Sequence, residues 1–299
     1  MKRAKPIVTE QRHSRSRALD LKSTREILNI LHRESARVPS AVGRELPVIA
    51  RAVDAVVKSL SNGGRLFYVG AGTSGRLGAL DAAELPPTFG ISARKVRAII
   101  AGGHRALTHA IEGAEDSAIA GARDLRRTGL KSNDVVAGIT ASGKTPYVLG
   151  ALREARARRA VTIGITSNRH SEIARLARIL IAPNTGAEVL AGSTRMNAGT
   201  AQKMVLNLLS TAAMVRLGYV YDNWMIGVAL TNRKLRARGL RILEEATGAS
   251  PRQAQHALRL ARHDLRVALL MLKTDGSAAE CRKKLQAAGG DLRRALGDR

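Results

Sequence analysis

Two short acidic segments and two hydroxyl-rich loops carry the side chains best suited to chemistry in this 299-residue chain. The acidic segments contain Glu84, within DAAELPP, and Glu115, within EGAEDS. Two carboxyl groups can act as general acid and general base when their surroundings give them different proton affinities. Acidic residues are also common at helix ends, where they interact with the free backbone amides. Taken alone, the acidic residues therefore leave both catalysis and helix capping open.

The two loops are small, glycine-rich and hydroxylated, and each follows a predicted strand. They are residues 70–76 (GAGTSGR) and residues 140–145 (TASGKT). Glycines, hydroxyl groups and the first amides of a following helix can together hold a phosphate group. The glycines and hydroxyl residues concerned are Gly72, Thr73, Ser74 and Gly75 in the first loop and Thr140, Ser142 and Thr145 in the second.

Each loop also matches a nucleotide-binding pattern. The first contains G-x-G-x-x-G, but residues 101–103 (AGG) follow the next strand, where a dinucleotide site needs an acidic residue. Residues 138–145 (GITASGKT) match the P-loop pattern of nucleoside triphosphatases. Such a protein also needs an acidic residue at the end of another strand to bind Mg²⁺, and no predicted strand ends in one. Pro146 also removes an amide from the start of the next helix. The loops therefore favour a single phosphate ester over a nucleotide.

The elements that must position these loops alternate between strands and helices. Apolar, β-rich runs occur at residues 65–69, 96–101, 134–139, 160–165 and 179–182. Helical patterns lie between them, for example at residues 116–127 and 147–158. This alternation predicts an α/β fold with a parallel sheet covered by helices on both faces. The functional loops of such a sheet lie beyond the carboxyl ends of its strands.

We expect three segments along the chain. Residues 1–60 form a helical lead-in, with breaks near Pro39 and Pro47, and residues 61–238 form the sheet domain, including a long helix from Asn197 to about Leu217. Residues 239–299 form a small helical C-terminal domain. Its helices are separated at residues 248–251, 274–277 and 289–290.

The composition narrows the possible partners and compartment. The net charge is +26, but the arginines are spread along helices and aromatic residues make up only 2%, so we expect no specific nucleic-acid binding. The positive side chains then form either a solvated surface or a weak binding site for polyanions. Their field would also speed encounters with a phosphorylated sugar. Cys281 has no partner for a disulfide, and charged residues interrupt the apolar residues 211–230. We therefore expect a cytoplasmic protein with no membrane span.

Four motifs resemble those of the N-acetylmuramic acid 6-phosphate etherases, a family of the sugar isomerase (SIS) superfamily. They are residues 70–89 (GAGTSGRLGALDAAELPPTF), 112–117 (EGAEDS), 140–147 (TASGKTPY) and 186–203 (GAEVLAGSTRMNAGTAQK). The resemblance extends from about Thr9 nearly to the C-terminus. It implies a three-layer SIS sandwich around a parallel sheet, with a small helical C-terminal domain.

The resemblance also implies a reaction and a role for each residue. The substrate is a sugar phosphate whose phosphate the two loops hold. Glu84 is the acid that protonates the departing lactyl oxygen, and Glu115 is the base that removes the C2 proton, giving N-acetylglucosamine 6-phosphate and D-lactate. Glu188 and Ser193 either complete the sugar site or cap a helix. No metal or cofactor is needed, and a homodimer is expected because SIS sites commonly lie at a subunit interface.

Three positions depart from the pattern of that family. Asn197 stands where a lysine is usual, Lys144 where an arginine is usual, and His13 where an asparagine is usual. The main alternative is a non-catalytic sensor of sugar phosphates, like the glucokinase regulatory proteins, but these carry two SIS units. A SIS transcription regulator would need an N-terminal helix-turn-helix, whereas the apolar pattern of residues 1–63 resembles the etherase lead-in.

Overall fold

The computed structural model describes residues 8–228, 230 and 232–298. The chain divides into two compact units. One comprises Met1–Ala82 and Arg94–Ser210, and the other comprises Ala83–Ala93 and Thr211–Arg299. Two helices, α4 (Gly72–Phe89) and α8 (Asn197–Arg216), run from the first unit into the second.

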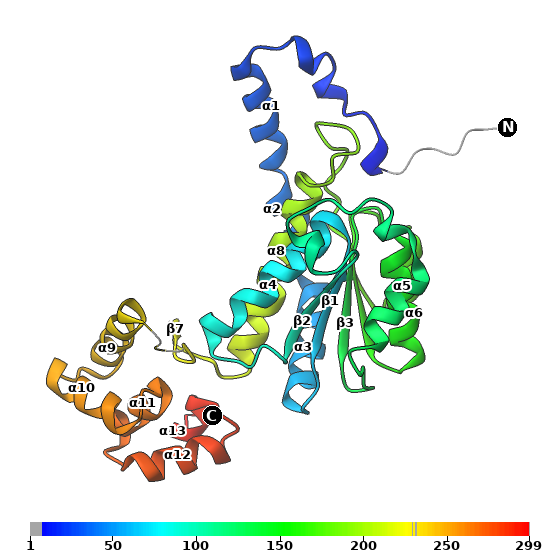
Figure 1. Ribbon diagram of the computed structural model, residues 1–299. Coiled ribbons are helices and arrows are strands. Elements are labelled where there is room, and N and C mark those ends of the chain that lie inside the picture. Colours follow the sequence, from blue (N-terminus) through cyan, green and yellow to red (C-terminus); the bar gives the residue numbers. More distant parts are fainter. Residues whose placement is uncertain (1–7, 229, 231, 299) are drawn as a thin grey trace. The chain divides into compact units, whose positions relative to one another are not determined.

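The first unit is built on a five-stranded parallel sheet, which confirms the predicted fold class (Figure 1). Its strands are β1 (Leu66–Gly70), β2 (Val96–Ile100), β3 (Val135–Ile139), β4 (Val161–Ile165) and β5 (Ile179–Ile181). They lie in the order β2-β1-β3-β4-β5. Every predicted strand is present, and its ends agree with the prediction to within one residue.

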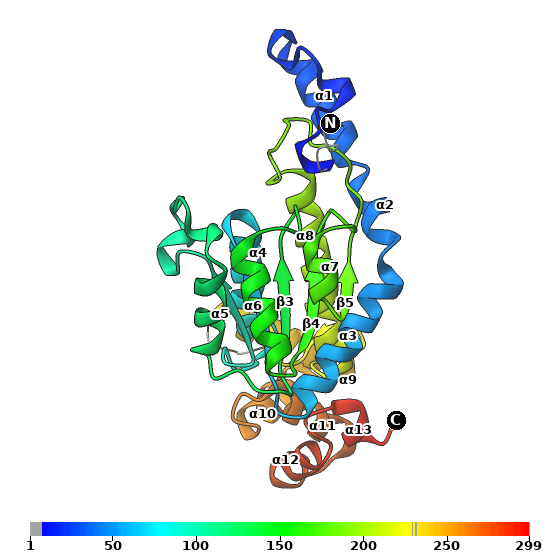
Figure 2. The same cartoon turned by 90° about the vertical axis from the view of Figure 1, so that its right-hand side faces the viewer.

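Helices cover both faces of the sheet, which explains why β1 and β3 are apolar and buried throughout. On one face, Phe67 and Val136 pack against α5 (Ala118–Arg126), α6 (Pro146–Ala157) and α7 (Glu172–Leu176). On the other face, Tyr68 lies so close to α4 that a Cβ at Gly78 would stand 2.9 Å from the tyrosine Cβ. Figure 2 shows the sheet behind α5, α6 and α7.

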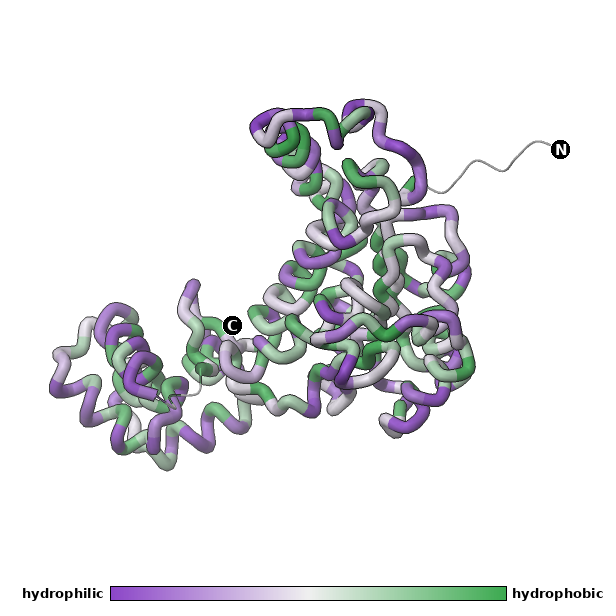
Figure 3. The backbone as a smooth tube through the Cα atoms, turned by 45° about the horizontal axis from the view of Figure 1, so that its top comes forward, coloured by the Kyte–Doolittle hydropathy of each residue, from purple (hydrophilic) through white to green (hydrophobic). Residues whose placement is uncertain are grey.

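The N-terminal segment is helical, as predicted. Three short 3₁₀ turns (Val8–Glu10, Ser14–Ser16 and Leu19–Leu21) precede α1 (Thr24–Ser35), α2 (Val38–Gly43) and α3 (Leu46–Ser61). Pro39 and Pro47 lie in the first turns of α2 and α3, where the missing amide has no helical partner to lose. Hydrophilic and hydrophobic stretches alternate along α1, at the top of Figure 3, as expected for a helix packed on one side only.

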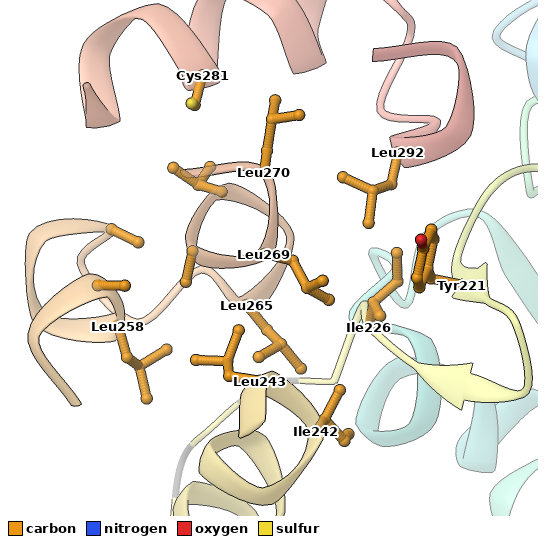
Figure 4. Packing of buried hydrophobic residues seen from close by; sticks show 14 of the residues in the cluster. Tyr221, Ile226, Ile242, Leu243, Leu258, Leu265, Leu269, Leu270, Cys281 and Leu292 are labelled. Carbon is orange, nitrogen blue, oxygen red and sulfur yellow. The ribbon is translucent and has the colours of Figure 1, made fainter. Parts of the chain in front are cut away.

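The second unit has its own apolar core, shown in Figure 4, where Leu243, Leu265, Leu269 and Ile226 point toward one another. Besides the ends of α4 and α8, the unit contains the β6–β7 hairpin (Val220–Tyr221 and Trp224–Met225) and the helices of the C-terminal region. These are α9 (Arg233–Thr247), α10 (Pro251–Leu260), α11 (Leu265–Thr274), α12 (Ala278–Ala287) and α13 (Leu292–Leu296). The helical C-terminal region is thus confirmed, and Cys281 is buried in its core.

Candidate active site

The two hydroxyl-rich loops follow neighbouring strands at the carboxyl edge of the sheet. β1 and β3 are paired with Gly70 opposite Ile139, so residues 71–76 and 140–145 leave the sheet side by side. The strand order reverses here, because β2 lies beyond β1 and β4 lies beyond β3. Open α/β sheets bind ligands in the crevice at such a switch point. The sequence predicted loops at this edge, and the structure places both at its switch point.

Glycine is required in the first loop because the backbone turns sharply and packs tightly. Gly72, where α4 begins, has a φ of 49°. Gly75 packs against β2 so closely that a Cβ would lie 2.5 Å from the Ile100 side chain. The loop therefore passes directly from the strand into α4, whose first amides lie at the switch point.

The polar side chains of the first loop face the start of α8. Ser74 is buried, and its Oγ donates a hydrogen bond of 2.9 Å to Oε1 of Gln202. Thr73 lies beside Gly199, with its Cγ2 3.4 Å from the place that a Cβ of this glycine would take. Gln202, to which the sequence analysis gave no role, holds the loop in place, and its Nε2 is buried without a partner in the described chain.

The hydroxyl groups of the second loop converge on Thr140. Its Oγ1 lies 2.8 Å from Oγ1 of Thr145 and 3.4 Å from Oγ of Ser142, and it accepts a hydrogen bond from the Gly143 amide. Gly143 has a φ of 73°, and Ser171 leaves no room for a Cβ there. Three hydroxyls are thus gathered just before α6, an arrangement that can donate to a phosphate.

Glu115 lies on a 3₁₀ turn (Ala114–Asp116) in the long connection between β2 and α5. Its side chain is exposed. This turn contacts α6, which directly follows the second loop. Arg76 of α4 fixes the same connection, since it donates hydrogen bonds to the carbonyls of Ala106 and His109. Arg76 was not recognised in the sequence, because its partners are 30 and 33 residues away.

Glu84 lies on α4, in the segment Ala83–Ala93 that belongs to the second compact unit. Its side chain is exposed. The helix continues through Pro86 and Pro87 to Phe89, so Glu84 is not at a helix end. Because these prolines have no amide, the carbonyls four residues earlier lack their usual helical donors. The acidic residue is thus presented on a helix rather than used to cap one.

Asp81, one turn before Glu84, belongs to a buried polar network. Its carboxylate accepts hydrogen bonds from the Tyr68 hydroxyl (2.8 Å) and from the Ser210 hydroxyl (3.0 Å). Burial raises the pKa of Asp81 above its usual value, outweighing these hydrogen bonds. The network joins β1, α4 and α8 within the first unit. No sequence pattern marks it, because its members are far apart along the chain.

The third motif brings Glu188 and Ser193 to the start of α8. Glu188 is 1% exposed, and its two oxygens accept hydrogen bonds from the amides of Asn197 (3.0 Å) and Ala198 (2.9 Å). Glu188 thus caps the start of α8. Ser193 is half-buried in the turn before the helix, where its amide donates a hydrogen bond to the Leu190 carbonyl. The Asn197 side chain accepts from the Ser35 hydroxyl at 3.3 Å.

In the described chain, the His, Cys, Asp and Glu side chains form no group of three or more that could hold a metal ion. Within the same residues, no helix has the length and apolar character that crossing a membrane requires.

The chain is similar over nearly its full length to several proteins of one family. The chain is 49% identical to the N-acetylmuramic acid 6-phosphate etherase of Geobacillus thermodenitrificans, over 97% of this chain and 98% of that one. It is 50% identical to the enzyme of the same name from Edwardsiella ictaluri, over 98% of both chains. Residues 48–156 match the glucokinase regulatory protein N-terminal SIS domain, and residues 117–212 match the SIS domain.

Among solved structures, a Bacteroides fragilis protein described as a phosphosugar isomerase involved in capsule formation shares the fold. The TM-score is 0.50 at 20% identity, and the match covers 67% of this chain and 95% of that one. This likeness concerns the sheet and its helices, in agreement with the SIS match.

Proposed function

The chain belongs to the N-acetylmuramic acid 6-phosphate etherase family, and we propose that it cleaves the D-lactyl ether of N-acetylmuramic acid 6-phosphate in the cytoplasm. The observation that carries this proposal is the full-length identity to etherases. The geometry supports it, because the two hydroxyl-rich loops lie together at the switch point of the sheet with Glu115 on the next connection.

The reaction is an elimination followed by addition of water. Opening of the sugar ring exposes an aldehyde at C1, which acidifies the C2 hydrogen. Glu115 takes this proton, the electron pair forms the C2–C3 double bond, and the C3–oxygen bond breaks while Glu84 protonates the lactyl oxygen. Water then adds at C3, giving its proton to the Glu84 carboxylate, and the proton held by Glu115 returns to C2. The products are N-acetylglucosamine 6-phosphate and D-lactate.

Binding of the substrate phosphate positions the sugar in the site. We assign it to the α4 amides at Gly72 and Gly75, the hydroxyls of Thr73 and Ser74, and the second-loop hydroxyls of Thr140, Ser142 and Thr145. Hydrogen bonds to a charged phosphate are stronger than those to a neutral group. Ser193, at the turn before α8, completes the sugar site in this proposal.

We propose that the protein acts as a homodimer in which Glu84 of a second subunit serves the site. Both hydroxyl-rich loops and Glu115 belong to the first compact unit, whereas Glu84 lies in the segment Ala83–Ala93 of the second. Its side chain is exposed on α4, where another subunit can contact it.

The activity is tested by D-lactate release from N-acetylmuramic acid 6-phosphate, with Glu84→Gln and Glu115→Gln variants. We expect each variant to lose on the order of 10²- to 10⁴-fold in rate. In D₂O, Glu84→Gln should still exchange the C2 hydrogen, whereas Glu115→Gln should not. Unchanged lactate release in both variants would rule out the acid/base pair. Tight binding by the intact protein without release would favour a sugar-phosphate sensor.

The shared site is tested by mixing these two inactive variants. If Glu84 and Glu115 come from different subunits, each mixed dimer regains one intact site and lactate release returns. If both come from one chain, the mixture stays inactive. Native mass spectrometry, with an affinity tag on one variant to give the two chains different masses, confirms in either case that subunits have exchanged.

A further inference from the structure

The N-terminal arm, residues 9–17, lies along the third motif within the first unit. The Gly192 amide donates to the Thr9 carbonyl at 3.1 Å, and the Ser16 hydroxyl donates to the Val189 carbonyl at 2.7 Å. These two contacts align the arm with residues 189–192, directly before Ser193. The arm therefore borders the segment that the sugar site uses.

Glu34 of α1 fixes the arm from behind. It is buried, and its carboxylate meets the His13 Nε2 at 3.3 Å, the Arg15 guanidinium at 3.2 Å and the Arg37 guanidinium at 2.9 Å. Although burial acts to raise it, hydrogen bonds from Arg37 and His13 lower the pKa of Glu34 below its usual value. The carboxylate thus stays charged near neutral pH. Its ion pairs with His13 and Arg15 hold the arm against α1.

A cavity of about 480 Å³ opens between the arm and residues 189–191. This size lies in the range of small-molecule sites, which is about 300–1,000 Å³. Arg12 and Arg17 line it, and neither guanidinium has an acidic partner in the described chain. Asp20 is the acidic residue among those that line it. The rest of the wall is largely apolar: Ala18, Leu19, Ile27, Val189, Leu190 and Ala191.

His13 also lines the cavity, and Glu34 holds its ring in place through Nε2. The cationic side chains of the cavity wall are therefore Arg12 and Arg17, which have no acidic partner in the part of the chain that the structure describes. Guanidinium groups that are free to pair favour an anionic ligand group, because their hydrogen bonds to an anion are charge-assisted.

The substrate of the proposed reaction carries an anion that the phosphate loops do not serve. Its lactyl group bears a carboxylate and a methyl group at the far side of the sugar from the phosphate. A carboxylate removed from water needs a cation or several donors, and an arginine can bind it through two parallel hydrogen bonds. Guanidinium groups on an apolar wall suit a carboxylate with a methyl group beside it.

We propose that this cavity binds the lactyl group of the substrate, with Arg12 and Arg17 pairing its carboxylate and the apolar wall receiving its methyl. This inference rests on the proposed function, and it makes the arm the part that distinguishes the ether substrate from a plain sugar phosphate. The place fits, because Ala191 is two residues from Ser193, and Thr73 of the first loop lies beside Gly199, at the start of α8. Figure 2 shows α1 beyond the same edge of the sheet to which the arrowheads of β3 and β5 point.

The test compares two ligands that differ only in the lactyl group. Binding of N-acetylmuramic acid 6-phosphate is measured by calorimetry on the Glu115→Gln protein, which prevents turnover, and binding of N-acetylglucosamine 6-phosphate is measured beside it. We expect Arg12→Ala and Arg17→Ala to weaken the lactyl ligand about 10- to 100-fold. The plain sugar phosphate should change less than about twofold. The affinity of Arg12→Lys for the lactyl ligand should lie between those of the intact arginine and Arg12→Ala, because lysine keeps the charge but cannot make two parallel hydrogen bonds.

Arg25→Ala is the matched control, since Arg25 is exposed on α1 outside the cavity and its loss changes the net charge equally. Equal weakening of both ligands, or of neither, in the Arg12 and Arg17 variants would overturn the inference. Arginine-dependent binding of the lactyl ligand without any turnover by the intact protein would overturn the etherase proposal and leave this one standing. Turnover by the intact protein, together with binding of the lactyl ligand that does not depend on Arg12 or Arg17, would support the etherase proposal and overturn this inference.

Discussion

Asp81 is a buried acid whose surroundings oppose its charge. It is 6% exposed, and burial raises its pKa above the usual value although Tyr68 and Ser210 donate to it. Because the folded-state pKa is higher than that of the unfolded chain, the protonated form favours folding. This contribution is complete below the unfolded pKa and is lost as pH rises through the folded pKa.

Replacing Asp81 by asparagine should therefore change the pH dependence of stability. The Asp81→Asn variant keeps an acceptor but cannot ionise, so its unfolding free energy should rise relative to the intact protein as pH increases from about 4. Urea midpoints over a pH series measure this. Glu154→Gln is a control of opposite sign, because hydrogen bonds from Arg126 lower the pKa of Glu154. A pH-independent difference for Asp81→Asn would contradict the prediction.

Single residues of the candidate site could be located in the sequence only where a local pattern marks them. The glycines and hydroxyls of the two loops form such patterns, as does Glu115 within EGAEDS. Gln202 does not, because its contact with Ser74 joins residues 128 positions apart. The contact of Asp81 with Ser210 spans 129 positions. Contacts of this range are set by packing of whole elements, which one sequence does not reveal.

Among the helices, α8 depends on an acidic residue from outside its own sequence. Helix starts leave amides without partners, and these are usually satisfied by a nearby serine, threonine, asparagine or aspartate. Here Glu188, nine residues before Asn197, serves the amides of Asn197 and Ala198. The sequence left capping and sugar binding open for Glu188, because its distance of nine residues from Asn197 does not match the usual spacing of a helix cap.

Truncation of Glu188 should accordingly destabilise the protein. The Glu188→Ala variant leaves two buried amides unpaired, at a cost of about 1–3 kcal/mol for each unsatisfied group. We expect the melting temperature to fall by about 5 °C or more. Glu188→Gln, which keeps one acceptor oxygen in a side chain of the same size, should lose less. An unchanged melting temperature with a raised KM would instead indicate direct contact with the sugar.

The central strands β1 and β3 were predicted well because they are short, apolar and buried throughout, so that composition alone marks them. Their order was not predictable, since pairing of β1 with both β2 and β3 depends on which crossovers the helices make. The length of α4 was also hidden. Pro86 and Pro87 normally disfavour a helix interior, yet Leu85 and Phe89, four residues apart, are both buried and hold the last turn in place.

Across the whole chain, the division into compact units does not follow the sequence order. The segment Ala83–Ala93 joins residues 211–299, more than a hundred positions away. Within this second unit the Phe89 and Tyr219 rings meet edge to face at 6.5 Å, and a Cβ at Gly90 would collide with the Gly227 carbonyl. Sequence patterns locate the helices of a unit but not the distant segment that completes it.

The net charge of +26 acts over the whole molecule and should govern how fast an anionic substrate arrives. A positive field raises the rate of encounter with a phosphate- and carboxylate-bearing sugar, and salt screens it, since the Debye length falls from about 30 Å at 0.01 M to about 10 Å at 0.1 M. We expect kcat/KM for lactate release to fall roughly threefold to tenfold over this range. The kcat at saturating substrate should stay nearly constant, because the field affects arrival rather than the chemical step. A kcat/KM that does not respond to salt would show that the arginine-rich surface is only solvated and has no part in substrate capture.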